Sequence, residues 1–135
     1  MRPAMKCTMA VVAGLVLGSA VNMGLIMISG LIIPPPNGVD VADMESLQAS
    51  MHLFEPRHFV FPFLAHALGT LAGSFLATRL YSAKGIVPGL IIGFFFLTGG
   101  IANAFLLPAP GWFVILDLVF AYLPTGWIGY SLAKR

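Results

Sequence analysis

Charge is scarce in this chain. Only 9% of its 135 residues are Asp, Glu, Lys or Arg, whereas 59% are hydrophobic. A soluble domain carries roughly 25% charged residues, and a soluble core of this size could not bury so much apolar surface. The composition therefore excludes an ordinary soluble domain, and the formal charge of +2 gives no basis for nucleic-acid binding. We expect the lipid bilayer to be the main partner of the protein surface.

Cysteine and the usual catalytic motifs are almost absent. The single cysteine, Cys7, allows no internal disulfide, no CxxC redox pair and no thiolate metal cluster. No HxxxH or ExxH pair lies on a predicted helix, as a metal site on one helix would require. The sequence also has no phosphate loop, dinucleotide fingerprint or nucleophile elbow. We therefore predict no catalytic residues, no cofactor and no metal, and a protein that is not an enzyme.

Four long apolar segments fill most of the sequence. Each has about the 20 residues that are needed to cross the hydrocarbon core, and only helices satisfy their own backbone groups in lipid. Prolines 34–36 end the first segment, and Pro108 and Pro110 end the third, because proline cannot continue a helix. The fold class predicted for residues 1–135 is a single all-α, four-helix transmembrane domain. The predicted helices are residues 8–33, 58–80, 86–107 and 111–133.

The basic residues predict an orientation. They occur near the N-terminus, around the second connection and at the C-terminus, whereas the first connection, residues 34–57, carries four acidic residues against Arg57 alone. Because lysine and arginine favour the cytoplasmic side, we predict that both termini are cytoplasmic and that residues 34–57 face outward. The basic residues at the three cytoplasmic positions are Arg2, Lys6, Arg79, Lys84, Lys134 and Arg135.

The outer connection has helical periodicity of its own. Asp40 is predicted to cap a short helix, with Asp43 in the first turn and Pro56 ending it. The pattern indicates an amphipathic helix on the outer surface, which is better explained as a connector packed against the bundle than as a lid. Its apolar positions are Met44, Leu47, Met51 and Phe54.

Small residues recur every four positions in the apolar segments. Positions four apart share a helix face, and small residues on that face let two helix backbones approach closely. A compact bundle can use all these faces internally; alternatively, the third segment, with Phe94, Phe95 and Phe96, contacts another subunit. The glycines predicted to lie at helix contacts are Gly14, Gly18, Gly69, Gly73, Gly89 and Gly93.

A few polar residues lie inside the apolar segments. The helical rise of about 1.5 Å per residue places several of them at a similar depth in the outer half of the membrane. Polar groups in hydrocarbon need partners or a cavity. They either pin the helices through hydrogen bonds or form an outward-facing pocket in which His66 and Asp117 pair. Such a pair can bind a proton, a small cation or a polar ligand. The predicted pocket residues are Asn22, His66, Thr70, Asn103, Asp117 and Glu45, with His52 or His58 as further candidates from the outer connection.

Two stretches resemble a group of small four-helix bacterial inner-membrane proteins with no assigned function. They are AHALGTLAG at 65–73 and the run from GGI at 99–101 through PGWF at 110–113 to DL at 117–118. The resemblance covers the second to fourth segments and implies a location in the bacterial inner membrane, but no activity. Small multidrug transporters of similar size carry a glutamate in their first helix, whereas the first segment here has no acidic residue.

Two functions fit these observations. The first is a non-catalytic integral membrane protein that acts through helix packing, as a subunit of a larger membrane complex or as a small homo-oligomer. The alternative is a small transporter or a ligand- or ion-binding membrane protein that uses the outward-facing pocket around His66 and Asp117.

Overall fold

The computed structural model describes residues 1–81 and 85–135. It is 81% helix, and the described residues contain no strand. Four helical stretches are long and apolar enough to cross a membrane, which confirms the prediction of four long apolar helices. They are Pro3–Ile32, Pro56–Tyr81, Val87–Leu106 and Gly111–Ala133.

The second and third long helices begin and end close to their predicted positions, as does the end of the first. α1 spans Pro3–Ile32, α3 spans Val60–Tyr81 and α4 spans Val87–Leu106. Pro3 occupies the first position of α1, where its missing N–H has no helical partner to lose, so this helix begins earlier than expected from its apolar residues alone. Lys84, which contributed to the predicted orientation, lies outside the described residues.

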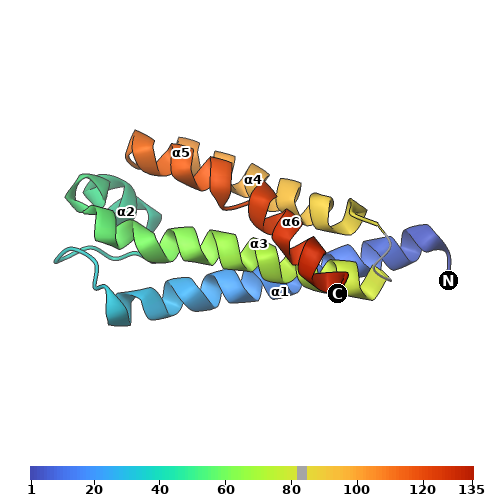
Figure 1. The fold of residues 1–135 in the computed structure, drawn as a ribbon. Coiled ribbons are helices and arrows are strands. Elements are labelled where there is room, and N and C mark those ends of the chain that lie inside the picture. The colour runs from blue at the N-terminus through green and yellow to red at the C-terminus, as the bar shows by residue number, and fades with distance from the viewer. Residues whose placement is uncertain (82–84) are drawn as a thin grey trace.

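The fourth span is broken into two helices, so the prediction of one continuous helix over 111–133 is wrong. α5 covers Gly111–Phe120 and α6 covers Leu123–Ala133. The cause is Pro124, which has no N–H to donate and whose ring clashes with the carbonyl of Phe120 in a regular helix. The chain turns between the two helices and changes direction, as Figure 1 shows.

α3 is the central helix of the bundle. It packs against α1 along much of its length and also contacts α4 and α6 (Figure 1). The chain termini lie toward one end of the bundle, and α2, Met44–Ser50, lies at the other. We call the latter the α2 end.

Glycines bring the backbones of α1 and α3 into direct contact. A methyl group added to Gly14 would lie 2.5 Å from the carbonyl oxygen of Gly73, and one added to Gly69 would lie 2.8 Å from that of Gly18. A real side chain never approaches backbone so closely. The two helices can therefore cross at this distance only because these positions lack a Cβ atom.

The two remaining predicted packing glycines are on α4. Gly89 faces α3, where an added methyl group would lie 2.6 Å from the hydroxyl oxygen of Ser74. Gly93 faces the start of α6, where an added methyl group would lie 3.3 Å from the side chain of Leu123. The structure thus places all six predicted glycines at contacts within the bundle.

The short helix of the outer connection is present, but its capping residue differs from the prediction. The N-cap of α2 is Asp43, whose carboxylate accepts a hydrogen bond from the backbone N–H of Ser46 at 2.9 Å. Asp40 was the predicted cap; its carboxylate instead accepts from the backbone N–H of Ala42 at 2.9 Å, in a turn before the helix. Both aspartates suit such local bonds, and only the backbone conformation decides which one caps.

The outer connection packs onto the helices through a small apolar cluster. After α2 the chain forms two 3-10 turns, η1 at Met51–Leu53 and η2 at Pro56–Phe59. Buried side chains of Met51, Phe59 and Phe113 pack together, and the rings of the two phenylalanines lie 4.6 Å apart. This cluster attaches the connection to α3 and α5, and its three side chains line a cavity at the α2 end.

Candidate functional site

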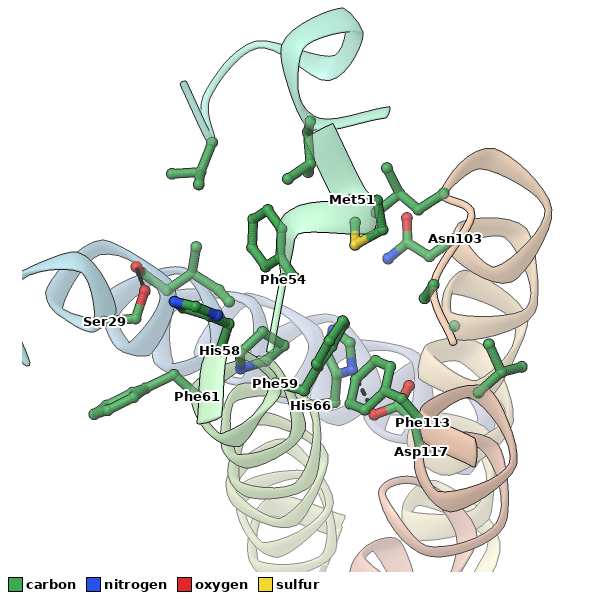
Figure 2. Close-up of a pocket in the computed structure, with 18 of the residues that line it drawn as sticks. Ser29, Met51, Phe54, His58, Phe59, Phe61, His66, Asn103, Phe113 and Asp117 are labelled. Atoms are coloured by element: carbon green, nitrogen blue, oxygen red, sulfur yellow. Dashed lines mark hydrogen bonds and ion pairs between the residues drawn. The ribbon is translucent and has the colours of Figure 1, made fainter. Parts of the chain in front are cut away.

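A cavity of about 280 Å³ lies at the α2 end, between α1, α3, α4 and α5 (Figure 2). The outer connection contributes to its wall through α2, η1 and η2. Most of its lining is aliphatic or aromatic, including Phe54, Phe59, Phe61 and Phe113. The polar residues that line it are Asn22, Ser29, His58, His66, Asn103 and Asp117.

His66 and Asp117 form the polar centre of this cavity. Nδ1 of His66 lies 2.8 Å from Oδ1 of Asp117, and Figure 2 shows the two side chains pointing toward one another. The hydroxyl of Tyr122 donates a hydrogen bond to the other carboxylate oxygen at 2.9 Å. Asp117 is only 4% exposed. The side chains of His66 and Tyr122, and not solvent, therefore provide the hydrogen bonds that stabilise its carboxylate.

The break in the fourth span brings Tyr122 to this carboxylate. Asp117 lies in the last turns of α5, and Tyr122 lies in the turn before α6. The tyrosine ring also stacks on the ring of His66, with centroids 5.7 Å apart and an angle of 26° between the planes. The turn is held by the Thr125 hydroxyl, which donates to the carbonyl of Ala121 at 2.6 Å. The break therefore helps to build the site.

The bond to Asp117 determines what His66 offers to the cavity. Since a carboxylate only accepts, Nδ1 of His66 carries the hydrogen of this bond. Nε2 is then an acceptor in the neutral ring and a donor in the charged ring. No residue in the described part of the chain hydrogen-bonds to Nε2. His66 can therefore bind a ligand group or take up a proton at this atom.

Asn22 and Asn103 both line the cavity, from α1 and α4. The side-chain oxygen of Asn22 is buried and has no hydrogen-bond partner among the described residues. A buried polar atom without a partner is unfavourable. This oxygen has almost no accessible surface, so it is not open to a ligand in the cavity, whereas Asn103 is exposed.

Two predicted pocket residues do not line the cavity. Thr70 is fully buried on α3, and its hydroxyl donates to the backbone carbonyl of His66 at 2.8 Å. Its hydroxyl therefore bonds within α3 and does not reach the cavity. Glu45 lies on the exposed surface of α2, outside the cavity wall.

The two histidines of the outer connection have different positions. His58 is buried and lines the cavity, and its Nδ1 accepts a hydrogen bond from the backbone N–H of Glu55 at 2.8 Å. Because Nδ1 accepts here, the ring is neutral with its hydrogen on Nε2. His52 is exposed and does not line the cavity.

Tyr122 and the aromatic wall of the cavity were not predicted from the sequence. One signal was present for the tyrosine, since Pro124 follows two residues later inside an apolar span, where proline breaks the helix. The rings of Phe59 and Phe113 had no such signal, because an aromatic residue in an apolar segment can equally face lipid.

Comparisons of the chain with family models, with curated proteins and with solved structures find no match. The chemistry of the site is therefore inferred from its geometry alone.

Proposed function

We propose that the protein is an integral membrane protein of the bacterial inner membrane with four spans and both termini in the cytoplasm. The number, length and apolar character of the four helical stretches support the membrane location. The distribution of lysine and arginine supports the orientation. The α2 end, with its cavity, then faces the outside.

This orientation predicts which positions a membrane-impermeant thiol reagent reaches. On a Cys7→Ser background, a Gln48→Cys variant places the thiol on the exposed surface of α2, and a Lys134→Cys variant places it near the C-terminus. In intact cells we expect labelling at position 48 and none at position 134 until the membrane is permeabilised. The reverse pattern would contradict the proposed topology.

We further propose that the cavity binds a small, largely apolar molecule with one polar group. The observation that supports this function is the pairing of His66 with Asp117 at a cavity whose other walls are mostly apolar. Ligand sites commonly combine an apolar lining with a few convergent polar groups, which orient the ligand. Here the apolar walls provide most of the contact, and Nε2 of His66 recognises the polar group.

A tryptophan in the cavity is expected to abolish this binding. Val114 and Ile115 are neighbours on α5, but Val114 lines the cavity and Ile115 is 67% exposed. We expect 4-tert-butylphenol to raise the melting temperature of the wild type and of Ile115→Trp in detergent, because binding to the native state stabilises it. The Val114→Trp variant should show no such rise.

The same experiment separates ligand binding from a purely structural function. A rise of equal size in Val114→Trp would place binding outside the cavity. No rise in any variant would contradict the binding function. The protein would then fit the alternative proposal of a subunit or homo-oligomer that acts through helix packing.

A further inference from the structure

The charges in the cavity restrict the class of ligand. Among the described residues that line the cavity, Asp117 is the only acidic one, and none is a lysine or an arginine. With His66 neutral, this part of the cavity carries one negative charge; with His66 protonated, the pair has no net charge. An uncompensated carboxylate in apolar surroundings is strongly unfavourable. A positive charge is therefore favoured there, either as a proton on His66 or as part of a ligand.

The other groups in the lining also suit a cation. Nε2 of neutral His66 is an acceptor without a partner among the described residues. Aromatic rings attract cations, and the partly exposed rings of Phe54 and Phe61 line the cavity. His58 adds no positive charge, because its Nδ1 already accepts from the backbone N–H of Glu55.

We propose that the cavity binds a small organic cation in exchange for the proton on His66; this inference rests on the proposed binding function. The cation enters as the imidazolium releases its Nε2 proton to water, and Asp117 keeps its negative charge throughout. The net charge of the cavity is then zero before and after the exchange. Asp117 and Tyr122 contact His66. The other titratable and polar residues that line the cavity are His58, Asn22, Asn103 and Ser29.

The exchange makes binding depend on pH with a defined sign. At low pH His66 is protonated, and the cation must compete with that proton. At higher pH the ring is neutral and the cation binds without competition. Release of one proton per bound cation corresponds to a gain in affinity of about tenfold per pH unit as long as His66 is protonated in the free protein.

The test uses the full chain in detergent micelles with two probes of the same shape. Phenyltrimethylammonium carries a permanent positive charge, and tert-butylbenzene is its neutral carbon analogue. We expect the cation to raise the melting temperature more at about pH 8 than at about pH 5. We expect the neutral probe to give the same rise at both. In weakly buffered solution at about pH 5, binding of the cation should release about one proton per protein, and at about pH 8 it should release almost none.

Three variants assign the exchange to its residues. His66→Gln removes the titrating group and should abolish both the proton release and the pH dependence. Asp117→Asn removes the negative charge and should weaken binding of the cation about tenfold or more at the higher pH, while the neutral probe still binds. His52→Gln, which changes the exposed histidine outside the cavity, should behave as the wild type.

The outcomes distinguish this inference from the function on which it rests. Equal, pH-independent binding of both probes would overturn the cation exchange and leave the binding function intact. Unchanged pH dependence in His66→Gln would overturn the exchange as well, because another group would then carry the proton. Failure of both probes to bind the wild type would overturn the inference and the proposed function together.

Discussion

Replacing Asp117 with alanine is expected to lower the free energy of unfolding by about 3 kcal/mol. The carboxylate is 4% exposed, and it accepts from both His66 and Tyr122. Its removal leaves two polar groups without a partner in the protein interior, and each such loss costs about 1–3 kcal/mol. Asp117→Asn keeps an acceptor oxygen and nearly the same volume, so we expect a smaller loss.

Unfolding of the purified protein in mixed micelles measures these differences. A double-mutant cycle with His66→Gln then isolates the pair, because residues in direct contact give effects that are not additive. Additive effects, or an Asp117→Ala protein as stable as the wild type, would show that the carboxylate is not bonded as described.

Gly14→Leu is expected to destabilise the bundle by at least about 3 kcal/mol, the upper range for overpacking of a core. The first added atom would already lie 2.5 Å from the carbonyl oxygen of Gly73 and 2.9 Å from Cβ of Ala77. Backbone cannot move aside as a flexible side chain can, so α1 and α3 must separate along their contact.

Gly24→Leu is the matched control for this substitution. It makes the same change on the same helix, but an atom added at Gly24 meets nothing within 4 Å. We expect its stability to remain within about 0.5 kcal/mol of the wild type, as for a surface substitution. Equal losses in the two variants would mean that the contact with Gly73 does not determine the effect, because leucine has the better helix propensity at both positions.

The long helices could be predicted because their signals are local. Apolar length sets the number of helical stretches, and the prolines after residues 33 and 107 end two of them. The cap of α2 could not be decided in the same way, since Asp40 and Asp43 are chemically identical candidates and both form local bonds. Their roles depend on backbone angles that the sequence pattern does not specify.

Only those parts of the candidate site that follow from a residue's depth in the membrane could be predicted. The helical rise places His66 and Asp117 at similar depths on different helices. Tyr122 was not predictable from a continuous helix, because five residues correspond to a rotation of about 140° away from Asp117. Only the break at Pro124 turns the tyrosine back toward the carboxylate. The cavity itself depends on how α1, α3, α4 and α5 are arranged at the α2 end, which no local pattern encodes.

The most direct test of the proposed site is a nitrogen NMR spectrum of the histidine side chains during titration with 4-tert-butylphenol. The chain has three histidines, so the resonances can be assigned by His→Gln substitution. Binding in the cavity should shift the Nε2 resonance of His66 most strongly, because this nitrogen has no partner among the described residues, and should leave exposed His52 unchanged. A saturating titration in which the His66 resonances do not move would contradict the proposed binding site.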